Sequence, residues 1–190
     1  MSVSQTREIQ ASDAARPYSE RLTRAQLIAL TRQSRLSNFV PPVNSVILGF
    51  LLWGNVPATL LLAWVALVWT TSAVRWPIFR QFDAAVSRGA GYERRWCPIM
   101  VTVHFVAGLV WGVSALALLF QDSILTEAYL VIFVLGMGAG ATASFAAFFP
   151  ALVAYLVPLA VPVAGILVAQ ETTEATVLGA AGFVFLVVLL

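Results

Sequence analysis

The chain of 190 residues is 60% hydrophobic and only 11% charged, with a mean hydropathy of +0.88. Soluble domains carry roughly 25% charged residues, so this composition excludes an ordinary soluble fold and favours an all-α, polytopic membrane helix bundle. All eleven basic residues are arginine and none lies beyond Arg95; we interpret them as cytoplasmic charges under the positive-inside rule and expect no nucleic-acid partner.

The scarce residue types exclude several chemistries. A single cysteine, Cys97, excludes an internal disulfide and a cysteine-rich metal site. The absence of lysine excludes a retinal Schiff base, and one histidine with no carboxylate inside a predicted crossing leaves no metalloprotease motif and no proton relay. We therefore predict that this chain has no catalytic residues, and the pattern assigns no metal ligands.

The N-terminal region is polar. Residues 1–17 show no periodicity and are predicted to form a disordered cytoplasmic tail, whereas residues 18–38 are predicted to form a cytoplasmic juxtamembrane helix. One side of that helix carries small and apolar residues: Leu22, Ala25, Ile28 and Ala29. Two interpretations remain open, a short solvated helix and an amphipathic helix that lies on the inner leaflet.

From residue 39 to residue 190 the pattern predicts a bundle of about six membrane-crossing helices. The predicted crossings are residues 39–53, 58–73, 97–120, 128–147, 151–169 and 176–190. A tight turn at 54–57 joins the first two into a hairpin, and Pro158 and Pro162 interrupt the fifth. The last crossing is short and ends without an interfacial anchor, which is typical of a truncated helix.

The connecting segments predict the orientation of the bundle. Residues 75–96 carry five arginines and are expected to form a cytoplasmic loop, with Arg75 and Trp76 at the membrane interface. Residues 121–127 and 170–175 carry only acidic charge and are expected to face the exterior. Both termini are therefore predicted to be cytoplasmic.

His104 is the only histidine, and it lies near the middle of the third predicted crossing. A titratable side chain at that depth is costly, which makes it a candidate for function. Met100 lies on the same helical face and Cys97 lies near it, so haem or copper ligation is one interpretation, although it requires a further ligand. The alternative is a histidine satisfied by a hydrogen bond between helices; the sequence leaves any cofactor unknown.

Small residues at four-residue spacing predict close helix packing. They are Gly108 and Gly112 in the third crossing, and Gly136, Gly140 and Ser144 in the fourth. A ligand cavity beside the fourth crossing is the alternative interpretation. Trp64 and Trp111 lie deeper than an interfacial aromatic belt requires, and they are candidates for lining a pocket that takes an apolar or quinone-like ligand.

Several stretches of sequence together resemble a known group of proteins. They are Arg32-Gln33-Ser34-Arg35, Trp111-Gly112, Gly136-Met137-Gly138-Ala139-Gly140-Ala141, and Phe149-Pro150 with Tyr155 and Pro158. Over roughly residues 30 to 190 the chain resembles the N-terminal membrane modules of bacterial signalling proteins. In that group the module precedes a cytoplasmic GGDEF diguanylate cyclase, often with PAS or EAL domains, or a sensor histidine kinase.

The resemblance implies a sensory and membrane-anchoring input module in the bacterial inner membrane. Such a module helps the protein to dimerise and passes a conformational bias to an output domain that this sequence does not contain. Because the predicted outer loops are short, a small or lipid-soluble stimulus is more plausible than a large extracellular ligand. The main alternative is a small structural subunit that packs in a larger membrane complex. A transporter is disfavoured because no charged residue lies inside a predicted crossing.

Overall fold

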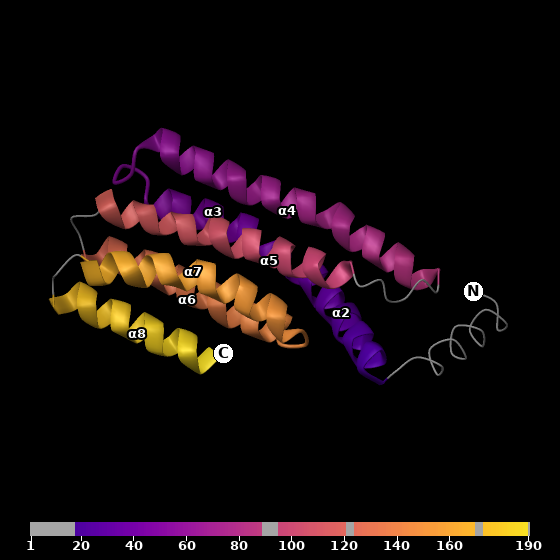
Figure 1. Ribbon diagram of the computed structural model, residues 1–190. Helices are drawn as coiled ribbons and strands as arrows, with labels where there is room; N and C mark the ends of the chain where they lie inside the picture. Colours follow the sequence, from indigo (N-terminus) through magenta and orange to yellow (C-terminus); the bar gives the residue numbers. More distant parts are fainter. Residues whose placement is uncertain (1–17, 89–94, 121–123, 170–172, 190) are drawn as a thin grey trace.

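The structure, a computed structural model, describes residues 18–88, 95–120, 124–169 and 173–189. Within these ranges the elements are α2 (Tyr18–Ser37), α3 (Val40–Leu51), α4 (Ala58–Ser87), α5 (Trp96–Gly112), the 3₁₀ helix η1 (Val113–Phe120), α6 (Ile124–Phe145), α7 (Phe149–Ala169) and α8 (Thr173–Leu189). Figure 1 shows α3 to α8 running side by side, with α2 inclined to them at one end. The predicted tail, residues 1–17, lies outside the described residues.

Four helices in the described part of the chain are long and apolar enough to cross a membrane. They are Ala58–Ser87, Trp96–Ala117, Glu127–Phe145 and Phe149–Ala169. The protein is therefore a helical membrane protein, and four of the predicted crossings are matched by such helices. The other two correspond to α3 and α8, whose 12 and 17 residues are fewer than the roughly 20 that a crossing helix needs.

α4 is longer than the sequence predicts. The prediction ends this helix at residue 73 and begins a polar loop at Arg75, whereas the helix continues to Ser87 with Pro77 inside it. One face is buried along its whole length: Leu61, Trp64, Val68, Ser72, Arg75, Phe79 and Phe82. These residues follow one another at intervals of three or four, so a single buried face extends past the predicted boundary. The prediction that a loop begins at Arg75 is thus wrong, whereas its position at the membrane interface stays a prediction.

The turn between α3 and α4 confirms the predicted hairpin. Gly54 has a φ of 89°, a conformation that glycine adopts without a steric penalty. The backbone amides of Asn55 and Val56 donate to the carbonyl of Leu52 at 3.1 and 3.2 Å. α3 and α4 then pack against each other, and α3 also contacts α6. This hairpin brings the N-terminal part of α3 beside the middle of α4.

α7 packs against α5, η1, α6 and α8. Its backbone lies closest to α5 at two glycines. A Cβ atom added to Gly108 would overlap the carbonyl oxygen of Tyr155, and one added to Gly112 would overlap the carbonyl oxygen of Pro158. Both positions therefore require glycine, because any side chain would collide with backbone rather than with a movable side chain.

α2 packs against α4 and α6 rather than standing free in solvent. Its buried residues are Arg24, Leu27, Leu30, Thr31 and Ser34. The side that the sequence singles out is a different one, because Leu22 and Ile28 are 47% and 39% exposed. A freely solvated helix is thus the wrong interpretation of α2, and contact of its exposed apolar side with the inner leaflet stays a prediction.

Candidate functional site

Four buried polar side chains gather where α2, α4, α5 and α7 approach one another. Ser34 and His104 are fully buried, and Arg75 and Tyr155 are 5% and 2% exposed. We call these four residues the polar centre. The ring of Phe145 closes one side of it, with centroids 4.5 Å from His104 and 5.3 Å from Tyr155. Polar atoms in such apolar surroundings are stable only when they find a hydrogen-bond partner.

His104 uses both ring nitrogens within the protein. Its Nδ1 lies 2.7 Å from the carbonyl oxygen of Met100, one turn earlier on α5, and its Nε2 lies 3.2 Å from the hydroxyl oxygen of Ser34 on α2. A carbonyl only accepts, so Nδ1 carries the proton and donates it, while Nε2 accepts from the hydroxyl. The hydrogen bond thereby ties α2 to the interior of the bundle.

This arrangement does not fit an axial haem or copper ligand. Coordination needs a free nitrogen lone pair, and the lone pair of Nε2 is directed to Ser34. Met100 is fully buried and is linked to the histidine through its backbone carbonyl. Among the described residues no group of three or more His, Cys, Asp or Glu side chains could hold a metal ion. The geometry favours the other interpretation, a histidine that joins two helices.

Arg75 belongs to the polar centre, although the sequence interpretation places it at the start of a loop. Its guanidinium lies over the ring of Phe79, 5.4 Å from the centroid, and its Nε is buried without a hydrogen-bond partner. The missed signal is the spacing: Ser72, Arg75 and Phe79 continue the three- and four-residue intervals of the apolar face of α4. The charge itself suggested a loop, but the periodicity indicated a buried position.

A cavity of about 280 Å³ lies beside Arg75, lined by residues of α2, α3, α4, α6 and α7. Its polar lining comprises Ser37, Asn44, Arg75, Ser144 and Tyr155. Gly136 and Gly140 also line it, and a Cβ atom on either would meet no atom within 4 Å. These two glycines and Ser144 were predicted to pack a helix, and within the described chain they border open space instead. The alternative prediction, a cavity beside this helix, matches the arrangement.

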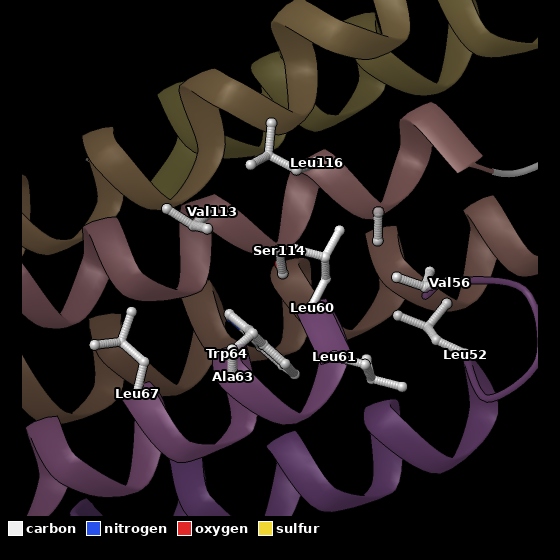
Figure 2. Close-up of a pocket in the computed structure, with 11 residues that line it drawn as sticks. Leu52, Val56, Leu60, Leu61, Ala63, Trp64, Leu67, Val113, Ser114 and Leu116 are labelled. Carbon is white, nitrogen blue, oxygen red and sulfur yellow. The ribbon is translucent and has the colours of Figure 1, made fainter. Parts of the chain in front are cut away.

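The two deep tryptophans contact each other. Trp64 and Trp111 meet edge to face, with ring centroids 5.3 Å apart, and the indole nitrogen of Trp64 donates to the carbonyl of Val110 at 2.9 Å. Trp64 lines an apolar groove of about 260 Å³ between the start of α4 and η1 (Figure 2). Trp111 does not line that groove; it is 1% exposed and borders a much smaller cavity of about 10 Å³ beside Arg75.

The groove in Figure 2 offers little to a polar ligand. Among the described residues that line it, the only polar side chain besides the indole is Ser114, whose hydroxyl donates to the carbonyl of Trp111 at 2.5 Å. The indole nitrogen of Trp64 is also committed to a backbone carbonyl. The groove can therefore accept a hydrocarbon chain, but it holds no group that would orient a quinone head.

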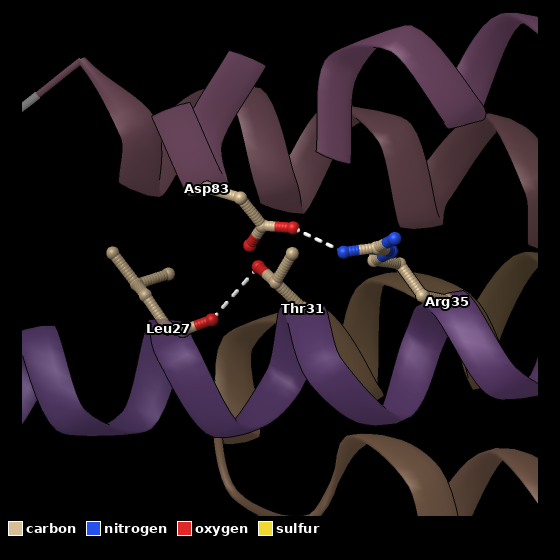
Figure 3. Close-up of polar contacts among 4 residues, drawn as sticks. All are labelled: Leu27, Thr31, Arg35 and Asp83. Carbon is tan, nitrogen blue, oxygen red and sulfur yellow. Dashed lines mark hydrogen bonds and ion pairs between the residues drawn. The ribbon is translucent and has the colours of Figure 1, made fainter. Parts of the chain in front are cut away.

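A second polar contact holds α2 in place. The Arg35 guanidinium donates to the Asp83 carboxylate on α4 at 2.5 Å, with both side chains partly exposed, and it lies 5.4 Å from the ring centroid of Trp76 (Figure 3). One turn earlier the Thr31 hydroxyl donates to the carbonyl of Leu27 at 2.8 Å. The Thr31 hydroxyl therefore bonds within α2, and the contact in Figure 3 that joins α2 to α4 is the ion pair between Arg35 and Asp83.

No protein-family model, no curated protein and no solved structure matches the chain. The resemblance to membrane modules of signalling proteins therefore stays a prediction. The functional argument accordingly starts from the polar centre, the cavity beside it and the docking of α2.

Proposed function

We propose that the chain is the membrane-anchoring, sensory input module of a bacterial signal-transduction protein in the cytoplasmic membrane. The output would come from a domain outside this sequence, of the diguanylate cyclase or histidine kinase type. The observation that carries the proposal is the hydrogen bond between Ser34 and His104, which couples α2 to the buried centre of the bundle. A module of this kind must link its interior to an element that lies outside the membrane.

The coupling has the form that a two-state switch needs. Ser34 and Arg35 on α2 bond to residues of two different helices, His104 on α5 and Asp83 on α4. A shift of either helix would change the position of α2, because the hydrogen bond and the ion pair cannot both follow helices that move apart. A ligand changes such an equilibrium only by contacting the two states differently, and the cavity beside Arg75 is where such contacts could differ.

The arrangement of charge supports a bundle with both termini in the cytoplasm and about six crossings. Every arginine in the described residues lies on α2, on the second half of α4, directly after α4 or just before α5. In Figure 1 these segments lie toward the same end of the bundle. Glu127, near the start of α6, lies at the other end. The positive-inside rule then puts the arginine-bearing end in the cytoplasm.

One observation favours the second candidate function, a structural subunit of a larger membrane complex. Gly136 and Gly140 are exposed on α6, and in the described part of the chain no atom lies within 4 Å of a Cβ added at either position. Small residues at this spacing allow a helix of another subunit, or of a second copy, to approach closely. The two functions differ in what accompanies the bundle, because the sensor requires a covalently attached output domain and the subunit requires only a partner.

The test is the size and composition of the native polypeptide. An epitope tag inserted in the N-terminal tail allows the product to be isolated from membranes of the original cells and analysed by immunoblot and peptide mass mapping. The sensory function predicts a polypeptide much larger than the 20.5 kDa of this sequence, with peptides of a cyclase or kinase domain. A product of 20.5 kDa that co-purifies with another membrane protein would instead establish the subunit.

A functional test then targets the coupling itself. In the full-length protein, Ser34→Ala should change cyclic dinucleotide production or autophosphorylation, because it removes the donor that joins α2 to His104. Ser87→Ala is the matched control, since its hydroxyl is exposed and bonds only to the carbonyl of Ala84 in its own helix. Equal output from both variants would argue against a signalling role for α2.

A further inference from the structure

The cavity beside Arg75 combines a buried cation with open space. Arg75 is 5% exposed, its Nε has no hydrogen-bond partner, and the residue lines the cavity of about 280 Å³. The Phe79 ring, whose centroid lies 5.4 Å from the guanidinium carbon, offers it a cation–π contact but no oxygen or nitrogen acceptor. A buried guanidinium in a membrane helix is strongly disfavoured unless an acceptor meets its donors.

The protein itself supplies no anion there. In the part of the chain that the structure describes, no Asp or Glu lines the cavity. Asp83, the carboxylate nearest to Arg75 along α4, is engaged by Arg35. The remaining polar groups of the lining are hydroxyls and an amide, from Ser37, Asn44, Ser144 and Tyr155, which are neutral. The charge of Arg75 is therefore left for a ligand to neutralise.

The rest of the lining is apolar and opens at the lipid-facing surface. Val40 and Met137 lie on opposite helices of the cavity, and Val40 is 48% exposed. Gly136 and Gly140 place no side chain in the cavity, and no atom lies within 4 Å of a Cβ added at either position. Small-molecule pockets commonly measure about 300–1,000 Å³. A cavity near the lower limit can hold a head group and the first part of a chain, with the remainder in lipid.

We infer that this cavity binds the anionic head of a single-chain amphiphile, with the Arg75 guanidinium as its counter-ion and the apolar lining around the first part of its chain. A carboxylate or a phosphate oxygen would satisfy the free N–H groups of the guanidinium with charge-assisted hydrogen bonds. The binding site does not depend on whether the chain serves as a sensor or as a subunit, so it stands apart from the proposed function.

Binding of tritiated palmitate to the purified full chain, delipidated in an uncharged detergent, tests the inference. We expect saturable binding that unlabelled palmitate displaces, while hexadecanol and acetate compete poorly because one lacks the charge and the other lacks the chain. Lysophosphatidylglycerol, which has a phosphate head and one acyl chain, distinguishes the sources: displacement identifies a lipid phosphate as an acceptable head, and failure to displace restricts the site to carboxylates. The absence of saturable binding, or equal competition by hexadecanol or acetate, would overturn the inference.

Two pairs of variants locate the site. Arg75→Gln should weaken palmitate binding on the order of tenfold or more, whereas Arg80→Gln, which removes an exposed arginine of the same helix, should not. Gly140→Leu should block the cavity with a side chain for which the structure has room, and Gly165→Leu adds the same side chain at another open, exposed position. If Arg75→Gln does not fold, the glycine pair still decides, and wild-type binding by Gly140→Leu would refute the proposed location.

Discussion

Ser34 and His104 are hydrogen-bonded to each other, so each side chain satisfies a polar atom of the other. The histidine is fully buried, so its Nε2 has no access to water when the hydroxyl is removed. Leaving a buried acceptor unsatisfied costs about 1–3 kcal/mol, more than the net gain of making an average hydrogen bond. The importance of Ser34 therefore comes from the atom it satisfies on α5 rather than from its own size.

Ser34→Ala should lower the stability of the folded protein by about 1–3 kcal/mol because it strands the Nε2 of His104. Thermal unfolding of the detergent-solubilised protein, followed by circular dichroism, measures the change as a lower midpoint. Ser87→Ala serves as the comparison, since it removes an exposed hydroxyl and should leave the midpoint within error. Identical midpoints for the two variants would show that the buried hydrogen bond contributes nothing.

The polar centre shows how far single residues can be predicted. His104 attracted attention because it is the only titratable group in the middle of a crossing, and the hydrogen-bonding alternative to haem agrees with its geometry. Its partner could not be found, because Ser34 lies 70 residues earlier and nothing local connects the two. Arg75 was misplaced because its charge was weighed before the periodicity of α4, which continues through it.

At the scale of helices, two glycine pairs with the same spacing have opposite surroundings. Gly108 and Gly112 on α5 lie against the backbone of α7, whereas Gly136 and Gly140 on α6 have no atom near the position of a Cβ. The sequence motif alone treats the pairs alike, because four-residue spacing indicates a flat helix face without identifying what lies on it. Which face is covered depends on the arrangement of the whole bundle.

Gly112→Ala and Gly136→Ala should therefore differ sharply in stability. The alanine at 112 forces its methyl group into the carbonyl of Pro158, and overpacking of this kind costs about 1–3 kcal/mol. The alanine at 136 meets open space and should be neutral or slightly stabilising, because alanine is the better helix former. Melting midpoints of the two variants in the same detergent make the comparison, and equal destabilisation would contradict the packing of α5 on α7.

The docking of α2 depends on a weaker contact that can be tested locally. Both Arg35 and Asp83 are partly exposed, with side chains 40% and 43% accessible, so their ion pair should contribute no more than about 1 kcal/mol. Asp83→Asn should raise hydrogen–deuterium exchange in α2 while leaving α5 and α7 unchanged. The effect should shrink at high salt, since exposed charges are screened. Faster exchange throughout the bundle would mean that the residue supports the whole fold instead.

At the scale of the whole molecule, the order of helices and the hairpin were predictable because long apolar runs and a Gly-Asn turn are local signals. The bounds of the helices were less predictable, because helix ends depend on packing, and the number of about six crossings stays a prediction beside the four helices that are long enough to cross. α4 continues to Ser87, into the predicted loop, because its buried face continues to Phe82. The predicted first crossing shortened to the 12 residues of α3, since the chain bends between α2 and α3.

Whether α3 crosses the membrane is the remaining question of topology. Its 12 residues span about 18 Å, less than the roughly 30 Å of the hydrocarbon core. Yet Val43, Ile47 and Phe50 are 57%, 46% and 80% exposed, and such a face is stable only in lipid or against another protein. The short helix lies antiparallel to the first half of α4, so one of its ends lies at the hairpin turn and the other beside the middle of α4. We therefore expect α3 to cross, with a locally thinned bilayer or with its flanking residues completing the span.

Single-cysteine labelling decides this point. In a Cys97→Ser background, Ser19→Cys, Asn55→Cys and Ser87→Cys place a thiol before α3, in the hairpin turn and at the end of α4. If α3 crosses, a membrane-impermeant maleimide added to intact spheroplasts should label the cysteine at 55 and not those at 19 and 87, and lysis should expose the latter two. Equal accessibility at 19 and 55 would make α3 a re-entrant segment and put α2 and the hairpin turn on one side. The polar centre would then lie near the membrane surface. In that case α2 and the end of α4 would lie on opposite sides of the membrane, which is hard to reconcile with the contact between Arg35 and Asp83.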